Sequence, residues 1–203
     1  MWSIAAGEAS RTFDEIVVAV APERLDEVAD AIRARSPRVR VIPGGATRTA
    51  SSWAALDATS ADVLAIHDSA RPFAPPSLFA RCVEVARREG SAVAGIALSD
   101  TVRRADEAGV SLEELEREGL WQVQTPQAFR RGSLERARRA AGDRSFTDDA
   151  AAVIAAGLRV KMIPGEPRNL KITTSEDLAY ARELVDKGLV AIAARSGPAR
   201  ALP

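Results

Sequence analysis

The sequence is poor in the residues that mark disulfide-bonded, metal-rich or membrane-spanning proteins. Its 203 residues include one cysteine and one histidine. The single Cys82 excludes an internal disulfide, and the single His67 excludes a metal site built from several histidines. No run approaches the roughly 18–20 uncharged apolar residues of a membrane-spanning helix, and the first residues lack the pattern of a secretory signal. The expected compartment is therefore a reducing cytoplasm.

The chain also lacks an excess of charge of either sign. It carries 28 basic and 28 acidic side chains, with a formal net charge of zero. Binding to nucleic acid by overall charge is therefore not expected. Lysine is scarce, since only Lys161, Lys171 and Lys187 are lysines and the other basic residues are arginines. Biased codon usage explains this ratio, but it makes each lysine worth inspecting.

What the sequence does contain is an alternation of short β-branched runs and amphipathic segments. Hydrophobic residues make up 46% of the chain, which is enough for a core and excludes a disordered chain. The predicted strands span 16–20, 39–42, 63–66, 92–98 and 159–163. The predicted helices span about 22–32, 51–58, 75–89, 132–141 and 175–185, with a further helix start at 147–149. This order is typical of an α/β fold with a mostly parallel sheet and helices on both faces.

Residues 101–121 interrupt that alternation. They contain short polar and apolar pieces and no long buried run, so we predict an excursion from the sheet, a β-hairpin arm. No linker or internal repeat divides the chain. We therefore expect a single domain over residues 1–190 and a disordered tail over 191–203, which is rich in alanine, arginine and proline.

Two polar motifs fall at the ends of predicted strands, where parallel sheets bind ligands. Residues 44–48 read Gly-Gly-Ala-Thr-Arg. The glycines permit close approach of a ligand and the next helix offers free amides, although an ordinary turn has the same sequence. Asp68 and Arg71 could hold a metal and a phosphate, or could pair with each other. His67 is predicted to pack or to hydrogen-bond, without a catalytic role.

Three further motifs lie in the second half of the chain. Residues 125–127 read Thr-Pro-Gln and could present a hydroxyl and amides to a ligand, or could form a turn, with Trp121 and Phe129 nearby in the core. Residues 147–149 read Thr-Asp-Asp, for which a plain helix cap is favoured. Lys171 lies in a short apolar run, where a lysine is costly to bury unless it faces an anion. A function is therefore favoured over an edge-strand lysine that prevents aggregation.

In their order and spacing these motifs resemble a known enzyme family. The matching segments are 44–48 with Ser51, 67–72, 100–104, 119–121, 125–129, 146–149 and 169–173. Together they resemble the 2-C-methyl-D-erythritol 4-phosphate cytidylyltransferase family of the non-mevalonate isoprenoid pathway, over about residues 2 to 187.

The resemblance implies a Rossmann-like nucleotidyltransferase fold with a projecting β-arm, and a homodimer formed through that arm. It implies transfer of a cytidylyl group from CTP to methylerythritol phosphate, with magnesium and release of pyrophosphate. The substrate's own phosphate oxygen would attack, so the protein would position the reactants and stabilise charge.

The resemblance also implies roles for individual residues. The catalytic residues would be Arg117, Lys171 and Asp68, with Asp68 holding the magnesium ion. The substrate-binding residues would be Arg71, Thr101, Thr125 and Thr147, with Thr101 and Arg117 reaching from the arm into the partner subunit's site. The nucleotide-binding residues would be Gly45, Ala46 and Ser51.

One part of the family pattern has no match. The family begins with a strand and a loop of the form Ala-Ala-Gly-x-Gly-x-Arg, followed by Pro-Lys, which wraps the triphosphate. We expect this strand and loop to be missing here and activity to be impaired, because losing one charge-stabilising donor costs about 10²–10³ in rate. Residues 5–11 imitate the loop, but no Pro-Lys follows and the strand at 16–20 leaves no room for a crossover helix.

Two other functions stay open. One is a cytidylyltransferase for another polyol phosphate such as ribitol 5-phosphate, since Ser69 stands where an alanine is common. The other is a catalytically inactive remnant, which the missing loop would favour. A dinucleotide-dependent dehydrogenase is set aside, because no G-x-G-x-x-G follows a predicted strand.

Overall fold

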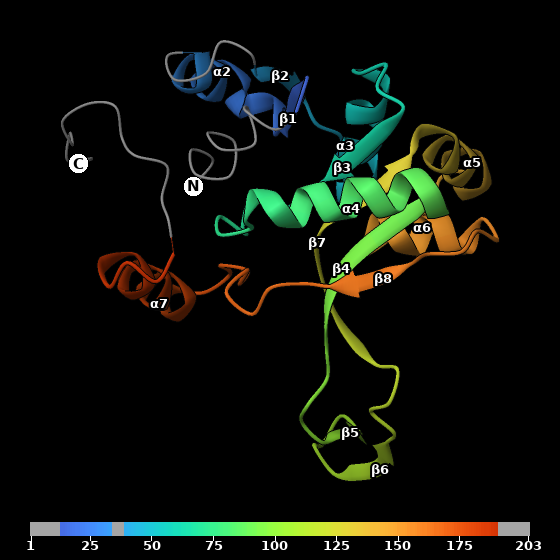
Figure 1. Cartoon of the computed structure of the whole chain (residues 1–203), viewed down its shortest axis with the longest axis vertical. Coiled ribbons are helices and arrows are strands. Elements are labelled where there is room, and N and C mark those ends of the chain that lie inside the picture. Colours follow the sequence, from blue (N-terminus) through green and yellow to red (C-terminus); the bar gives the residue numbers. More distant parts are fainter. Residues whose placement is uncertain (1–12, 34–38, 191–203) are drawn as a thin grey trace.

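The computed structural model describes residues 13–33 and 39–190, and these form the expected alternation of strands and helices (Figure 1). Residues 5–11 and the tail at 191–203 lie outside the described residues. In chain order the elements are β1 (Ile16–Val20), the 3₁₀ helix η1 (Pro22–Arg24), α2 (Leu25–Arg33), β2 (Val39–Pro43), α3 (Arg48–Asp57), β3 (Val63–Ile66), α4 (Pro76–Glu89), β4 (Ser91–Ala97), β5 (Val102–Ala105), β6 (Ser111–Leu115), β7 (Trp121–Arg130), α5 (Arg131–Ala141), α6 (Asp149–Ala155), β8 (Met162–Pro164) and α7 (Ser175–Asp186).

The strands of the body form two sheets. β1 pairs with β2 in parallel, and a second sheet has the order β3-β7-β4-β8. In that sheet β4 and β8 are parallel, whereas β7 runs antiparallel to both β3 and β4. The predicted α/β class is confirmed, and the second sheet is mixed because one antiparallel strand lies inside it.

β7 is the element that the sequence patterns do not predict. Its pairing with β4 shifts register, since Val93 faces Gln127 and Gly95 faces Val123. Three residues of β7 (124–126) therefore oppose one residue of β4, which is a bulge. The proline of this bulge has no N–H to give to the ladder, so it is tolerated where the regular pairing is interrupted. The alternative of a turn at the Thr-Pro-Gln motif is wrong.

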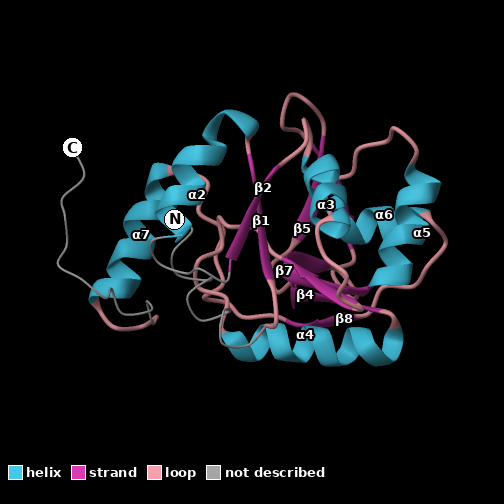
Figure 2. Ribbon diagram, turned by 90° about the horizontal axis from the view of Figure 1, so that it is seen from above, coloured by secondary structure: helices cyan, strands magenta, loops and turns pink. Residues whose placement is uncertain are grey.

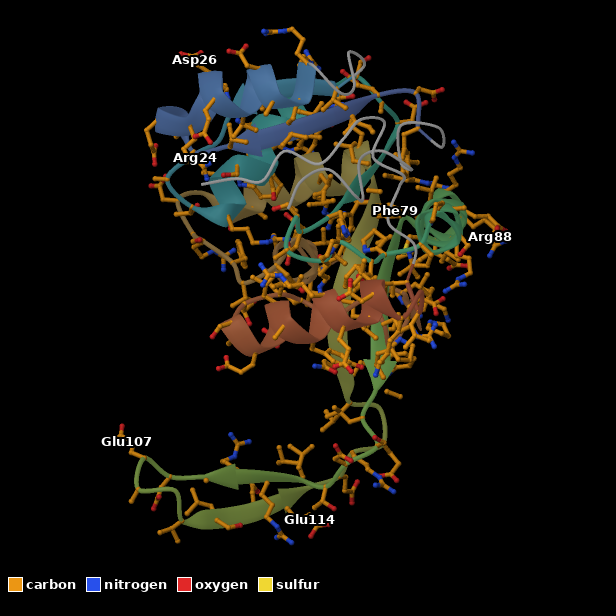
Figure 3. The ribbon with its side chains drawn as sticks, turned by 90° about the vertical axis from the view of Figure 1, so that its left-hand side faces the viewer. Arg24, Asp26, Phe79, Arg88, Glu107 and Glu114 are labelled. Atoms are coloured by element: carbon orange, nitrogen blue, oxygen red, sulfur yellow. The ribbon has the colours of Figure 1, made fainter. Side chains whose placement is uncertain are left out.

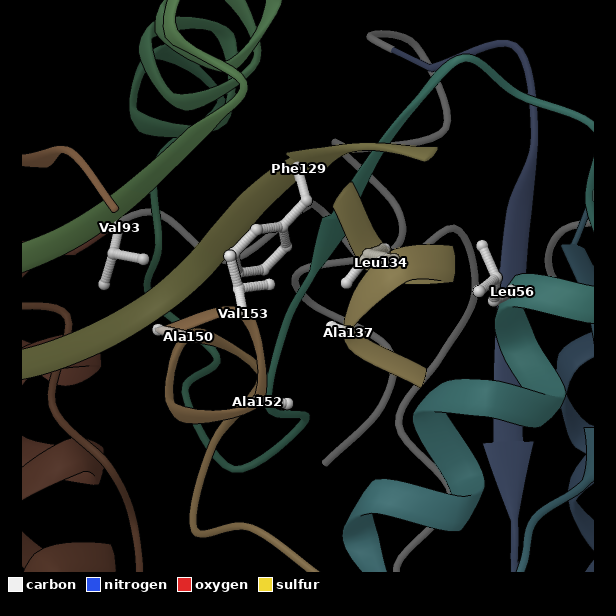
Figure 4. Close-up of a cluster of buried hydrophobic side chains, with 8 residues drawn as sticks. All are labelled: Leu56, Val93, Phe129, Leu134, Ala137, Ala150, Ala152 and Val153. Atoms are coloured by element: carbon white, nitrogen blue, oxygen red, sulfur yellow. The ribbon is translucent and has the colours of Figure 1, made fainter. Parts of the chain in front are cut away.

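Helices cover both faces of the four-stranded sheet, as predicted. α4 lies on one face, and α3, α5 and α6 lie on the other (Figure 2). Because side chains alternate along a strand, Val93 and Phe129 belong to one buried cluster and Ala92 and Ala128 to the opposite one. Figure 4 shows Phe129 at the centre of the first cluster, beside Val153 of α6. The small alanines allow α4 to pack close to the sheet.

The predicted β-arm is confirmed as the antiparallel hairpin β5–β6, which projects from the body (Figures 1 and 3). Glu107 lies at its tip (Figure 3). Arg104 and Glu113 form an ion pair across the two strands at 2.5 Å. Val110 and Leu112 are 59% and 60% exposed. A two-stranded hairpin is marginally stable in water on its own, so these apolar side chains leave the arm in need of further contacts.

Some boundaries differ from the predictions. α3 begins at Arg48 and not near residue 51, because the Thr47 side chain caps it by accepting a hydrogen bond from the Ala50 amide. β8 spans only 162–164, and residues 169–173 form a loop and not a strand. Trp121 is only half-buried, whereas Phe129 lies in the core as predicted. In the part of the chain described, no helix is long and apolar enough to cross a membrane.

Cys82 provides a test of this packing. Cys82 belongs to α4 and is 0% exposed, and its thiol donates a weak hydrogen bond to the Pro126 carbonyl of β7. Burial raises the pKa of the Cys82 thiol to about 12, so the reactive thiolate is scarce in the folded protein. We predict that an aromatic disulfide reagent at pH 8 modifies the folded chain only at the rate of unfolding, and modifies one thiol per chain at once in denaturant. Rapid modification without denaturant would contradict the packing of α4 on the sheet.

Candidate functional site

Three buried polar side chains of β7 each accept a hydrogen bond from the backbone of a different loop. Gln124, Thr125 and Gln127 are 5%, 4% and 1% exposed. The three bonds are Glu166 N to Gln124 Oε1 (3.1 Å), Asp68 N to Thr125 Oγ1 (3.0 Å) and Ala150 N to Gln127 Oε1 (3.1 Å). The loop after β8, the loop after β3 and the start of α6 are thus attached to one strand.

The amide of Gln127 joins β7 to the cap of α6. Its Nε2 donates to Asp148 Oδ2 at 2.9 Å, while Asp148 Oδ1 accepts from the Ala151 amide at 2.7 Å. The helix cap expected at the Thr-Asp-Asp motif is confirmed, with Asp148 as the capping residue. Only a side chain with both a donor and an acceptor can satisfy Asp148 and the Ala150 amide together.

Asn169 and Arg71 attach the loop after β8 a second time. Asn169 is 0% exposed and donates to the Thr125 carbonyl at 2.7 Å and to Gln124 Oε1 at 3.3 Å. Arg71 donates from Nη1 to the Asn169 carbonyl at 2.8 Å and from Nη2 to the Val123 carbonyl at 3.3 Å. The guanidinium therefore lies across β7 and the loop that leads to Lys171.

Asp68 stands between two cationic side chains. Its carboxylate lies 3.1 Å from Lys171 Nζ and 3.4 Å from Arg48 Nη2. Burial alone would raise the pKa of Asp68, but the hydrogen bonds and charges of Lys171 and Arg48 outweigh it and hold that pKa below its usual value. Asp68 is therefore a carboxylate at neutral pH. The Lys171 side chain is 46% exposed, so one of the two cations can also meet a molecule in solvent.

Arg48 bridges Asp68 to a second, buried acid. Its Nη1 lies 2.8 Å from Asp149 Oδ2 as an ion pair without hydrogen-bond alignment, and the Asp149 side chain is 2% exposed. Burial raises the pKa of Asp149, and the charge of Arg48 opposes that shift. We call Arg48, Asp68, Asp149 and Lys171 the Asp68 cluster. It combines two acids and two bases from four separate segments.

The predicted nucleotide-binding residues lie at the start of α3, the helix that carries Arg48. The Gly45 amide donates to Ser51 Oγ at 3.1 Å. A Cβ at Gly45 would lie 2.4 Å from the Ala50 Cβ, so close approach requires glycine here. Gly45 and Ala46 are exposed, and Ser51 is half-buried. The fold thus brings this loop into the same region as the Asp68 cluster, and its role stays a prediction.

The other predicted residues are more scattered. Thr147 is exposed and directly precedes the cap of α6, so it lies close in sequence to Asp149 of the Asp68 cluster. Thr101 and Arg117 are exposed at the base of the arm, where the Arg117 guanidinium donates to the Ser99 carbonyl. Within the described residues neither forms a hydrogen bond or ion pair with the Asp68 cluster. Their roles stay predictions that involve a second subunit.

The capacity of this region for a metal is limited. Over residues 13–33 and 39–190, no group of three or more histidine, cysteine or acidic side chains could hold a metal ion. Mg²⁺ in nucleotide sites is commonly held by one or two carboxylates together with substrate phosphates. Asp68 is a carboxylate and is 20% exposed, so it fits a site in which Mg²⁺ is held by one carboxylate together with substrate phosphates.

The sequence places Arg48, Asp149 and Gln127 in candidate motifs but does not predict an individual role for any of them. Arg48 closes the Gly-Gly-Ala-Thr-Arg motif, but nothing in that motif identifies its partner. Asp149 carried a usable signal, because it is an acid directly followed by three alanines in a helix. A carboxylate on a helix face that alanines bury needs a cationic partner.

The chain is similar to proteins of one family along nearly its whole length. The family model described as "IspD: 2-C-methyl-D-erythritol 4-phosphate cytidylyltransferase" matches residues 1–187. The 2-C-methyl-D-erythritol 4-phosphate cytidylyltransferase of Deinococcus radiodurans is 40% identical over 185 residues, which cover 88% of this chain and 76% of that protein. The bifunctional enzyme IspD/IspF of Anaeromyxobacter sp. (strain Fw109-5) is 42% identical, over 85% of this chain and 46% of that protein.

Solved structures of this family are also similar to the chain. The crystal structure of 2-C-methyl-D-erythritol 4-phosphate cytidylyltransferase from Thermus thermophilus aligns with a TM-score of 0.77 at 34% identity, covering 89% of this chain and 86% of that one. This chain spans less than half of the length of four bifunctional relatives that it matches.

The role of the Gln127 side chain, which hydrogen-bonds to Asp148 and to the Ala150 amide, can be tested. In Gln127→Glu an ionised carboxyl group would face Asp148, whereas a protonated one could still donate to it. The introduced carboxyl group thus has a raised pKa in the folded state. The variant therefore loses stability only as the pH rises and this group ionises. We predict that the free energy of unfolding falls by about 2–3 kcal/mol at pH 7, and that the loss shrinks as the pH is lowered toward 5.

The matched control is Gln122→Glu, which makes the same change at an exposed position of the same strand. Its effect should stay within about 0.5 kcal/mol at every pH. Denaturant unfolding of both variants between pH 5 and 8 gives the comparison. Equal curves for the two variants would mean that Gln127 does not hold the α6 cap.

Proposed function

The chain belongs to the 2-C-methyl-D-erythritol 4-phosphate cytidylyltransferase family, and we propose that it transfers the cytidylyl group of CTP to 2-C-methyl-D-erythritol 4-phosphate. The observation that carries this proposal is the contact of Lys171 with Asp68 at 3.1 Å in a chain of this family. It puts an available cation and an ionised carboxylate side by side beyond the end of β3. Such a pair suits a reaction between two phosphate-bearing substrates.

In the proposed reaction a phosphate oxygen of the polyol phosphate attacks the α-phosphorus of CTP. A new P–O bond forms, the bond from the α-phosphorus to the oxygen bridging to the β-phosphorus breaks, and pyrophosphate leaves with that electron pair. No protein nucleophile is needed, so catalysis consists of positioning and charge stabilisation. Lys171 would turn from Asp68 to the attacking phosphate, together with Arg117 from a second subunit.

Asp68 is the proposed magnesium ligand. When bound, Mg²⁺ would neutralise charge on the triphosphate and on the leaving pyrophosphate. The lowered pKa of Asp68 supports this role, because its carboxylate is charged and needs no proton loss before binding a cation. Arg48, which is also anchored to Asp149, would remain beside Asp68 and orient it.

The remaining proposed contacts follow the loops around the Asp68 cluster. Arg71 and Thr147 would bind the polyol phosphate. Thr125 is only 4% exposed and its hydroxyl is bonded to the Asp68 amide, so its effect on substrate would run through Asp68. The backbone of Gly45 and Ala46, with the Ser51 hydroxyl, would contact the cytosine and ribose. The proposed compartment is a reducing cytoplasm, which suits the free Cys82.

A homodimer through the arm is part of the proposal. The hairpin β5–β6 projects from the body (Figure 1) and has two exposed apolar residues, Val110 and Leu112. A second copy of the chain would bury that surface and bring Thr101 and Arg117 to the partner's Asp68 cluster. This supports a shared active site between two subunits.

Turnover is tested by pyrophosphate release from CTP with Mg²⁺ and methylerythritol phosphate, with ribitol 5-phosphate as competitor. The proposal expects release that depends on methylerythritol phosphate and is little affected by ribitol 5-phosphate. If the chain used ribitol 5-phosphate in preference, that compound and not methylerythritol phosphate would be the substrate. If the full chain shows no turnover and no calorimetric binding of CTP, the inactive alternative is favoured.

Lys171→Met tests the central pair. We predict that kcat falls about 10²–10³-fold, the effect of removing one charge-stabilising donor, while the melting temperature changes little because Lys171 is half-exposed. The control is Lys187→Met, which removes an exposed lysine that pairs with Glu183 at the end of α7. Equal kinetics for the two variants would contradict the role of Lys171.

Mixing two inactive variants tests the shared site. Arg117→Ala removes the arm's contribution and Asp68→Ala removes that of the body. We predict that a mixed dimer of the two regains activity at about one of its two sites, since one site would combine an intact arm with an intact body. Heterodimers verified by differently tagged chains that show no recovery would contradict the arm geometry.

A further inference from the structure

His67 is the single histidine of the chain, and both nitrogens of its ring are hydrogen-bonded. Nδ1 lies 2.9 Å from Thr125 Oγ1, and Nε2 lies 2.9 Å from the Arg71 carbonyl oxygen. Phe79 of α4 packs edge-on against the imidazole, with ring centroids 4.9 Å apart. The ring is thus held in one orientation at the end of β3.

The partners determine where the protons lie. The Arg71 carbonyl can only accept, so Nε2 carries the proton and donates it. Thr125 Oγ1 already accepts from the Asp68 amide at 3.0 Å, and its own hydrogen is free to be donated to Nδ1. The hydrogen bonds therefore run in one direction, from the Asp68 amide through Thr125 to His67 and on to Arg71.

This chain of bonds holds both ends of the turn at residues 68–71. The turn is closed by the Arg71 amide, which donates to the Asp68 carbonyl at 3.0 Å. His67 binds the Arg71 carbonyl directly and the Asp68 amide through Thr125. The two residues at the ends of this turn carry the carboxylate of the Asp68 cluster and the guanidinium that spans β7. An apolar side chain in place of His67 would leave the Arg71 carbonyl and the Thr125 hydroxyl without these partners.

We propose that His67 is a positioning residue, which acts in its neutral Nε2–H tautomer by orienting the 68–71 turn for cytidylyl transfer. It touches neither substrate nor metal in this role. The inference rests on the proposed function for its catalytic consequence, and its hydrogen-bond pattern can be tested separately from activity.

The first experiment observes the tautomer. Because the chain has one histidine, a ¹⁵N-histidine-labelled sample gives one pair of ring nitrogen signals. We expect a protonated Nε2 and an unprotonated Nδ1, and we expect Thr125→Val to shift the Nδ1 signal while Nε2 stays protonated. Thr59→Val is the control, since it removes a hydrogen-bonded hydroxyl that contacts Glu15 outside this turn. A protonated Nδ1, or an Nδ1 signal unaffected by Thr125→Val, would overturn the inference whatever the activity.

The second experiment measures kinetics with two half-replacements. His67→Gln retains an N–H that can reach the Arg71 carbonyl but loses the acceptor for Thr125. His67→Asn retains an acceptor near the position of Nδ1 but loses the bond to Arg71. We expect His67→Gln to lower kcat about 10²-fold, the effect of a misplaced catalytic group, with the KM for CTP changed less than about 3-fold. His67→Asn should retain more activity.

A double-variant cycle separates positioning from general destabilisation. If His67 acts through Thr125, adding Thr125→Val to His67→Gln should lower kcat by less than about 3-fold more. Full additivity, or a loss explained by a smaller folded fraction, would overturn the positioning role. A wild-type chain without turnover would instead overturn the proposed function, and with it the catalytic consequence, while the tautomer result would stand by itself.

Discussion

The structure depends on hydrogen bonds between one strand and the loops around it. Gln124, Thr125 and Gln127 of β7 are buried, and they accept hydrogen bonds from backbone amides of the loop after β8, the loop after β3 and the start of α6. A buried amide left without a partner costs about 1–3 kcal/mol, so none of these loops can leave β7 freely. Gln124 and Thr125 lie in the bulge, where the pairing of β7 with β4 is interrupted, whereas Gln127 is paired regularly with Val93.

The Asp68 cluster is the consequence of that attachment. Arg48 arrives on α3, Lys171 on the loop after β8, Asp149 on α6, and Asp68 on the loop after β3. The formal charges of its two acids and two bases balance, and each acid is paired with a base. They differ in exposure, since Asp149 is enclosed whereas Lys171 is half-exposed. The buried ion pair therefore anchors the cluster, and the exposed lysine is the member that can exchange its partner for a phosphate.

The strands with simple residue patterns could be predicted from the sequence alone. β1 and β3 are uninterrupted β-branched or aliphatic runs, and their bounds were predicted correctly. β7 was missed because Pro126 and four uncharged polar residues interrupt its apolar pattern. Three of these polar residues, Gln124, Thr125 and Gln127, hold the neighbouring segments. Lys171 was selected because a lysine in an apolar run needs an anion, but its partner Asp68 could not be deduced. That pairing depends on the antiparallel position of β7, which no local pattern encodes. The arm residues Thr101 and Arg117 were reached by resemblance alone.

Amide hydrogen exchange tests the attachment of the loops to β7 most directly. The three amides to follow are those of Asp68, Ala150 and Glu166, observed by NMR in the native protein. If the buried side chains of β7 hold the loops, all three should exchange nearly as slowly as the core amides of β4 and β7, through global unfolding. Exchange of these amides at the rate of exposed loop amides, while the core of the sheet stays protected, would contradict the account.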